Sequence, residues 1–316
     1  MTERKFRTSV VTGHTDMSFG EIVEHSVCAA KTGVDGLWLS QLPNQRDVCL
    51  LLASIASHVA DVTIGTAILP IYQSPPVVMA QAAMTLDEIC GGRLVLGLGR
   101  GHRLVGEWIL GGKYALTTAP VREYLTIVTS LIREGEANMV GSAYEAHAFY
   151  GPPRRPSLPV YLAALGPRML ELAGEIADGV ILWMCTPTYI HDVVMPSLRA
   201  GWARRAGDHT GFEVVAMVPA VATPRPEQDR EHARGMLSGY MRLENYKKVL
   251  IASGFDAEVK ALRPSDAMID ALCAIGSGQM VRERLDAFRT AGVTEIAVAP
   301  LVTERFAATV EAALPA

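Results

Sequence analysis

Residues 82–102 of the chain read AAMTLDEICGGRLVLGLGRGH. The double glycine at 91–92 ends a segment of helical period and leads into an almost continuous apolar run at 94–98. Such runs are typical of parallel strands that helices cover on both faces. The alternate glycines of residues 97–101 let the backbone approach a ligand at the carboxyl end of this strand. Their spacing differs from the GxGxxG dinucleotide fingerprint, so these residues alone indicate either a ligand-binding loop or a plain tight turn.

Similar aliphatic runs alternate with longer helical segments along the chain. This rhythm predicts parallel βα units, and a closed barrel buries both faces of every strand without leaving a sheet edge. The chain has 316 residues, 49% of them hydrophobic and 20% charged, which suits one large aliphatic core. We therefore expect a single-domain parallel (β/α)8 TIM barrel over residues 1–316. The expected strands are 8–12, 36–40, 62–68, 94–98, 160–163, 179–183, 214–222 and 295–299.

Two insertions interrupt the rhythm, at about residues 101–159 and 224–264. The first contains one clear helix, at about 120–134, followed by irregular sequence over 141–153, and the second is helical and charged. We expect both on the C-terminal face of the barrel, where such segments shape the active site. The alternative is that an insertion only covers the barrel or contacts another subunit. For the second insertion, the sequence favours neither this alternative nor a place in the active site.

The charge and the cysteine content narrow the possible partners. A net charge of −4 gives no basic field for a phosphate backbone, so we expect no nucleic-acid partner. No run reaches the ~18 apolar residues of a membrane span, and the first residues lack the apolar core of a signal peptide. The five scattered cysteines are typical of a reducing compartment, and no residue cluster has metal-ligand spacing. These features predict a cytoplasmic protein that binds no metal and acts on a small-molecule substrate.

Three blocks of sequence resemble the luciferase-like monooxygenase family. They are 86–102, with its Leu-Asp-Glu helix end and Gly-Gly-Arg turn; 64–76, IGTAILPIYQSPP; and 159–183, PVYLAALGPRMLELAGEIADGVILW. The blocks occur in the family's order over most of the chain, and the unit at 278–300 is also similar. The resemblance implies a barrel that holds a flavin-type cofactor in its mouth.

Within the family, the chain looks closest to the branch that uses the 5-deazaflavin coenzyme F420. This branch includes methylenetetrahydromethanopterin reductase and F420-dependent glucose-6-phosphate dehydrogenase. Residues 65–70 and the Ala-Ala-x-Gly-Pro block favour F420 over FMN, the alternative cofactor. The resemblance implies a homodimeric oxidoreductase that transfers a hydride between C5 of the deazaflavin and an organic substrate. An FMN-dependent monooxygenase and a non-catalytic cofactor-binding protein are the alternatives.

Carried over position by position, the resemblance implies a cofactor site at the strand ends. The Ala67–Ile68 peptide corresponds to a cis bond that forms a bulge behind the cofactor ring. Two positions depart from the family, since Gln41 replaces an Asp near the ring and Leu42 replaces a proton-donating His. These departures argue against sugar phosphates and favour a hydrophobic or cofactor-like substrate. The implied cofactor-binding residues are Gln41, Thr66, Ala67, Ile68, Leu69, Arg100, Gly101, His102, Ala164, Leu165, Gly166, Arg168 and Met169.

The segment 163–168, AALGPR, also supports a phosphate site on physical grounds. A strand end, a glycine and a helix start leave N–H groups without helical partners, which together with the helix dipole favour an anion. Arg168 adds a formal charge. An ordinary turn with a solvated arginine is the alternative from these residues alone.

Three side chains are candidates for the chemistry and the substrate pocket. His102 takes the place of a family Glu that does acid/base work, and an imidazole can serve either role near pH 7. We therefore expect His102 to be the catalytic acid/base. His14 and Trp183 follow expected strands and would line the substrate pocket; as alternatives, His14 is a hydrogen-bonded structural residue and Trp183 fills the barrel.

Overall fold

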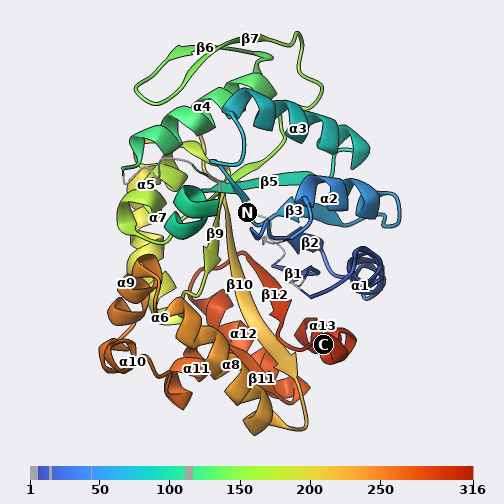
Figure 1. The fold of residues 1–316 in the computed structure, drawn as a ribbon, viewed down its shortest axis with the longest axis vertical. Coiled ribbons are helices and arrows are strands. Elements are labelled where there is room, and N and C mark those ends of the chain that lie inside the picture. Colours follow the sequence, from blue (N-terminus) through green and yellow to red (C-terminus); the bar gives the residue numbers. More distant parts are fainter. Residues whose placement is uncertain (1–5, 14–15, 44, 110, 112–116, 316) are drawn as a thin grey trace.

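The computed structural model describes residues 6–13, 16–43, 45–109, 111 and 117–315. Its eight barrel strands are β1 (Arg7–Val11), β2 (Gly36–Leu39), β3 (Thr63–Thr66), β5 (Leu94–Gly99), β8 (Val160–Ala163), β9 (Gly179–Trp183), β10 (Glu213–Ala222) and β12 (Glu295–Pro300). They are parallel and pair in this order, and β12 pairs back to β1 to close the ring (Figure 1). The (β/α)8 barrel is confirmed, and each expected strand matches an observed one to within two residues at either end.

Two short strands extend this ring. After a bulge, β4 (Leu69–Pro70) resumes the pairing with β5, so that Leu69 lies opposite Leu98. β11 (Ala274–Gly276) pairs with the end of β10. The sequence pattern does not reveal β11, because a strand of three residues directly after a helix leaves no periodicity to recognise.

Helices cover the outside of the barrel (Figure 1). Ser18 begins the first of them with a capping box, in which its hydroxyl accepts from the Glu21 N–H and the Glu21 carboxylate accepts from the Ser18 N–H. None of the described helices is both long and apolar enough to cross a bilayer. The covering helices are α1 (Phe19–Lys31), α2 (Val48–Ala56), α3 (Pro76–Ile89), α4 (Ala119–Arg133), α5 (Pro167–Ile176), α6 (Pro187–Tyr189), α7 (Met195–Trp202), α12 (Gly278–Thr290) and α13 (Phe306–Ala313).

The first insertion contains a hairpin that the sequence did not predict. Residues 101–118 connect β5 to α4 and include a π-helical turn at Val105–Ile109. After α4, the segment expected to be irregular forms part of an antiparallel pair, β6 (Glu136–Val140) and β7 (Glu145–Phe149). The expectation was wrong because the buried positions of the hairpin are the small residues Ala137 and Ala146, so the alternation of hydrophobicity that marks a strand is weak.

The tip of this hairpin is fastened to α4. The Glu123 carboxylate accepts hydrogen bonds from the Ser142 N–H at 2.9 Å and the Ser142 hydroxyl at 2.7 Å, and from the Ala143 N–H at 2.8 Å. These hydrogen bonds stabilise the charged carboxylate and lower the pKa of Glu123 to about 2. Because Glu123 lies near the start of α4, the hairpin turns back along this helix (Figure 1).

The second insertion is helical, as expected. It contains α8 (Pro226–Tyr240), α9 (Glu244–Ala252) and α10 (Asp256–Ala261), and α11 (Asp266–Leu272) follows it. Their apolar faces enclose a separate core cluster that contains the buried side chains of Leu237, Met241 and Leu250. The same cluster includes Met184 and the partly buried Trp183. Since Trp183 and Met184 lie at the carboxyl end of β9, the insertion packs against the mouth of the barrel.

A buried carboxylate closes the opposite, N-terminal end of the barrel. Glu295 is 1% exposed, accepts a hydrogen bond from Nε1 of Trp38 at 2.7 Å and pairs with Arg7. Arg7 also lies 3.7 Å from the carboxylate of Glu213 on β10. One carboxylate on β12 therefore ties together the first two strands of the ring and, through Arg7, reaches β10.

Replacing Glu295 with Ala should destabilise the fold. The change removes the acceptor of the Trp38 N–H and the nearer of the two carboxylates beside the Arg7 guanidinium, and removing one partner of a buried pair costs about 3–5 kcal/mol. Chemical denaturation of Glu295→Ala should show this loss, and the exposed Glu136→Ala variant should unfold like the wild type. Equal unfolding free energies for the Glu295 variant and the wild type would contradict the role given to this carboxylate.

Candidate active site

The predicted site residues gather at the carboxyl ends of five strands that are neighbours in the ring, β2, β3, β5, β8 and β9. Gln41 follows β2, residues 66–69 span the end of β3 and the start of β4, residues 100–102 follow β5, residues 164–169 follow β8, and Trp183 ends β9. His14 lies outside the described residues. The fold therefore brings all the other predicted residues to one face.

A bulge between β3 and β4 forms one wall of this mouth. The Ala67–Ile68 peptide bond is cis, which confirms the prediction made from the sequence. The Ala67 N–H donates to the Leu39 carbonyl at 2.7 Å, and its carbonyl accepts from the Ser40 hydroxyl at 2.6 Å. The Gln41 N–H donates to the Ile68 carbonyl at 3.3 Å. These bonds fasten both sides of the cis bond to the end of β2, and Ser40 is a contributor that the sequence did not single out.

Close strand packing explains two glycines of the 97–101 pattern. A Cβ on Gly97 would lie 1.9 Å from the carbonyl oxygen of Thr66. The Thr66 hydroxyl donates to the Gly97 carbonyl at 2.9 Å and accepts from its N–H at 2.8 Å. A Cβ on Gly99 would lie 3.0 Å from the Cβ of Ala163. These positions hold the bulge against β5 and β8, and Gly101, at φ +62°, turns the chain out of the strand.

The start of α5 is open to a ligand. Gly166 is the N-cap residue, and no side chain in the described structure caps the first turn of this helix. A Cβ on Gly166 would meet nothing within 4 Å, and Arg168 is exposed. The Leu165 carbonyl accepts a hydrogen bond from the Tyr189 hydroxyl at 2.9 Å, which fixes the loop. The geometry fits an anion held by backbone N–H groups beside a cation.

Five predicted cofactor residues have buried side chains. They are Thr66, Ala67, Leu69, Ala164 and Met169. Only their backbone groups are therefore available to a ligand. The side chains of Ile68, Arg100 and Leu165 are half-buried, so they can contact a ligand directly.

The side chain of Gln41 is engaged with the loop that leads to α2. Its Oε1 accepts from the Val48 N–H at 2.9 Å, and its Nε2 donates to the carbonyls of Leu42 at 3.3 Å and Arg46 at 3.4 Å. The neighbouring Leu42 side chain is exposed. The replacement of the family's Asp and His therefore leaves an amide that supports the loop, and an apolar side chain that cannot exchange a proton.

His102 is half-buried at the carboxyl end of β5. Burial lowers the pKa of its imidazole, because removal of water disfavours the charged form. No carboxylate among the described residues contributes to this shift. The imidazole is therefore held towards its neutral form at neutral pH, in which one ring nitrogen can accept a proton.

Two tyrosines of the second insertion reach the site, and the sequence analysis missed both. The ring centroid of His102 lies 6.4 Å from that of Tyr240 and 5.8 Å from that of Tyr246. Tyr240 also meets Trp183 edge-on, with 5.9 Å between the centroids. The sequence pointed to these tyrosines only through the expected position of the second insertion on this face. No motif or regular spacing relates positions 240 and 246 to position 102.

Apolar side chains form the floor of the mouth. Val11, Ile68, Ala163 and Trp183 are partly buried and pack on the cluster that fills the barrel interior. The floor, the backbone of the bulge and the open start of α5 suit a planar ring with an anionic tail. In the described ranges, no group of three or more His, Cys, Asp and Glu side chains is placed to hold a metal ion.

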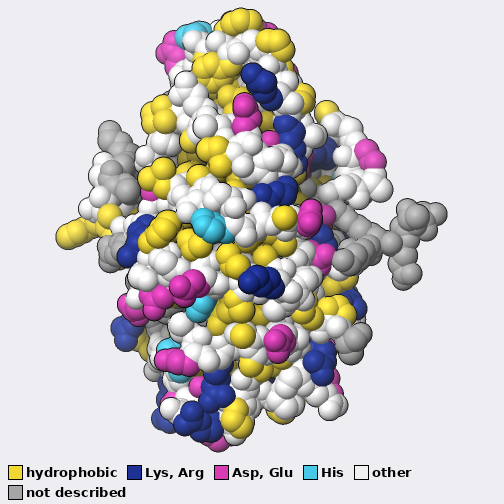
Figure 2. Space-filling model, turned by 90° about the vertical axis from the view of Figure 1, so that its right-hand side faces the viewer, with side chains coloured by type: hydrophobic (Ala, Val, Ile, Leu, Met, Phe, Trp, Pro, Cys, Tyr) yellow, Lys and Arg dark blue, Asp and Glu magenta, His cyan; other side chains and the backbone are white. Residues whose placement is uncertain are grey.

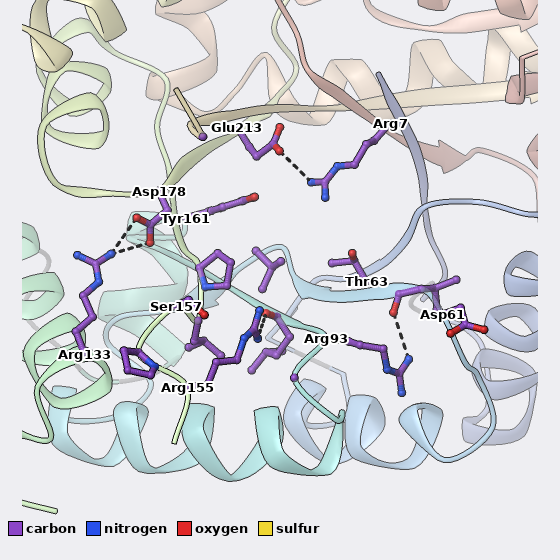
Figure 3. Close-up of a pocket in the computed structure, with 18 residues that line it drawn as sticks. Arg7, Asp61, Thr63, Arg93, Arg133, Arg155, Ser157, Tyr161, Asp178 and Glu213 are labelled. Carbon is purple, nitrogen blue, oxygen red and sulfur yellow. Dashed lines mark hydrogen bonds and ion pairs between the residues drawn. The ribbon is translucent and has the colours of Figure 1, made fainter. Parts of the chain in front are cut away.

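A cavity of about 770 Å³ lies at the other end of the barrel (Figure 3). Its walls come from the starts of the strands, and its charged groups pair with acidic side chains: Arg133 with Asp178 at 2.7 Å, and Arg155 with Asp87 at 2.6 Å. In (β/α)8 barrels this face serves stability, and the reactive groups lie at the carboxyl ends of the strands. We therefore place the active site at the mouth and not in this cavity.

Two curated relatives are similar over much of the chain. The 5,10-methylenetetrahydromethanopterin reductase of Archaeoglobus fulgidus is 27% identical over 89% of this chain and 90% of its own. The F420-dependent glucose-6-phosphate dehydrogenase of Amycolatopsis mediterranei is 30% identical over 57% of this chain and 59% of its own. Both similarities fall in the branch that the sequence blocks indicated.

The fold also matches a solved structure, that of an F420-dependent secondary alcohol dehydrogenase in complex with an F420-acetone adduct. The TM-score is 0.82 at 16% identity, and the match covers 98% of this chain and 100% of that one. The model of the family described as luciferase-like monooxygenase matches residues 4–295. With the barrel, the cis bulge and the glycine-lined end of β5 in place, the chain belongs to the luciferase-like monooxygenase family.

Proposed function

We propose that the protein is an F420-dependent oxidoreductase that transfers a hydride between C5 of the deazaflavin and an organic substrate. The observation that carries this proposal is the open, uncapped start of α5, which lies at the same mouth as the β3–β4 bulge that Ser40 fastens to β2. The names of the similar reductase and dehydrogenases support F420 as the cofactor. The cofactor would supply the hydride acceptor or donor, and the protein its position and surroundings.

The described residues fit this cofactor in two places. The half-buried Ile68 and the backbone of residues 67–69 offer a flat apolar wall to the ring, and residues 100–102 would meet its edge. Gly166 and Arg168 would hold the phosphate, because the helix start is uncapped and open. Thr66, Ala164 and Met169 would act through their backbones, since their side chains are buried.

His102 is the proposed acid/base. It is the titratable side chain of the predicted set that lies at the mouth with a lowered pKa, and Gln41 is held by the loop. The aromatic surroundings of His102 and the loss of the family's Asp and His favour a hydrophobic or cofactor-like substrate over a sugar phosphate. A non-catalytic cofactor-binding protein is the rival reading, which cofactor binding without turnover of any substrate would support.

We also propose that the protein is a cytoplasmic homodimer. All five cysteines are free thiols, as expected in a reducing compartment. Leu50 on α2 and Val78 on α3 are 74% and 48% exposed, and each is the third residue of its helix. Figure 2 shows hydrophobic side chains between charged ones over the side of the molecule on which α2 lies. An apolar pair on adjacent helices is the kind of surface that a second copy would cover.

The purified protein should bind F420 more tightly than FMN. The reason is the similarity of residues 64–76 and 159–183 to the F420-dependent branch, and fluorescence quenching measures both affinities. Micromolar or tighter binding of FMN with no response to F420 would reverse the ranking and favour the FMN-dependent monooxygenase.

Arg168→Ala and Gly166→Val should both weaken cofactor binding and leave the fold intact. Loss of a charge-assisted contact costs roughly 1.5–3 kcal/mol, a factor of about ten to a hundred and fifty in affinity. A valine at 166 fits the open space but blocks the phosphate. Gly211→Val, at another open glycine, is the matched control. If the affinity for F420 stays the same in both variants, the phosphate does not bind at α5.

A charge at position 50 should break the dimer. Leu50→Asp places a carboxylate in the proposed apolar contact, where it would be desolvated. Light scattering coupled to size exclusion should report a dimer for the wild type and a monomer for Leu50→Asp, while Glu136→Ala stays dimeric. A monomeric wild type would refute the proposal.

A further inference from the structure

Three aromatic side chains of the second insertion and of β9 stand around His102. Tyr240 is the last residue of α8 and Tyr246 lies in α9. Their rings meet edge-on with 4.9 Å between the centroids, and each lies within 6.4 Å of the imidazole. Trp183 continues this row on the far side of Tyr240. We refer to Tyr240, Tyr246 and Trp183 as the aromatic wall.

The aromatic wall is supported from behind. Tyr246 is 8% exposed, and the fully buried Met241 lies in the short link between the two tyrosines. Leu237 on α8 and Leu250 on α9 are 1% exposed and belong to the same core cluster. Such packing restricts the rotamers of the rings, so the wall has a fixed position relative to the end of β5.

We propose that Tyr240 and Tyr246 are positioning residues, which shield the His102 imidazole from water and fix its orientation at the mouth of the barrel. This inference rests on the proposed function, because it takes the mouth to be the place of reaction. The inference gives the second insertion a role in that reaction. Its two tyrosines are more than a hundred residues from His102 in the sequence but lie beside it in the structure.

The rings that pack against the imidazole are uncharged. Tyr240 and Tyr246 face it from α8 and α9, and burial raises the pKa of Tyr240, so that this phenol keeps its proton. On its own segment, Arg100 and Arg103 flank the histidine, and Arg103 is exposed and pairs with Glu107 at 2.9 Å. Burial lowers the pKa of His102, and the rings of Tyr240 and Tyr246 are among the groups that exclude water from the imidazole.

A neutral histidine beside aromatic rings selects a class of substrate. An anionic reacting group brought against the faces of these rings would lose its hydration without gaining a hydrogen-bond donor from them. A planar or apolar body with an uncharged reacting group would bury its surface against the rings and still reach a ring nitrogen for proton exchange. We therefore assign the mouth to a neutral, ring-bearing or otherwise apolar substrate.

The test is an NMR titration of the His102 imidazole in the protein without cofactor, with the signal assigned from His102→Gln. In Tyr246→Ser and in Tyr240→Ser, water reaches the ring, so the pKa of His102 should rise towards its ordinary value of 6.5. Tyr246→Phe keeps the ring, and Ile251→Ala changes an exposed side chain of α9 that does not support the wall. The pKa of His102 should stay as in the wild type in these two controls.

Tyr240→Ser removes a half-buried ring, so it tests the wall even if Tyr246→Ser fails to fold. A pKa of His102 that is unchanged in every folded serine variant overturns the inference, as does an equal rise in Ile251→Ala. Binding of F420 to the wild-type protein, measured by titration, tests the proposed function independently of the pKa of His102. A pKa that rises as expected in a protein that does not bind F420 supports the shielding role and refutes the cofactor.

Discussion

The paired hydrogen bonds between the Thr66 side chain and the Gly97 backbone set the geometry on which the mouth depends. They hold the end of β3 against β5 at a distance that only a glycine at 97 allows. The bulge follows directly, with its cis bond at Ala67–Ile68, and Gly99 then brings β5 close to Ala163 on β8. If β5 stood further out, neither the wall for a cofactor ring nor the floor beneath it would form.

The barrel and its insertions contribute different groups to the site. The barrel strands supply backbone and apolar surface, since side chains such as Thr66 and Met169 are buried. The second insertion supplies Tyr240 and Tyr246, which face the one candidate acid/base, His102. In the proposed function, binding of the cofactor and choice of the substrate would therefore be divided between parts of the chain that can change independently.

The sequence predicts the barrel well because each parallel strand is apolar on both faces and stands between recognisable helix caps. The cis bond was predictable only through the family resemblance. The hairpin was missed because alanines occupy its buried positions. The role of Gln41 could not be read either, since its hydrogen bonds to the backbone at 42, 46 and 48 depend on the path of a loop. The tyrosines were missed because their proximity to His102 is set by tertiary packing alone.

The pairing of β1 with β12 has a consequence for how the protein is made. Arg7 and Glu295, whose side chains join these strands, are 288 positions apart. On the ribosome, the edge of β1 stays open until nearly the whole chain has emerged. An unpaired strand edge is a template for pairing with other chains, and domains that close late pass through states prone to association. Slow synthesis or a shortage of chaperones should therefore reduce the yield of this protein more than that of one whose strands pair with near neighbours.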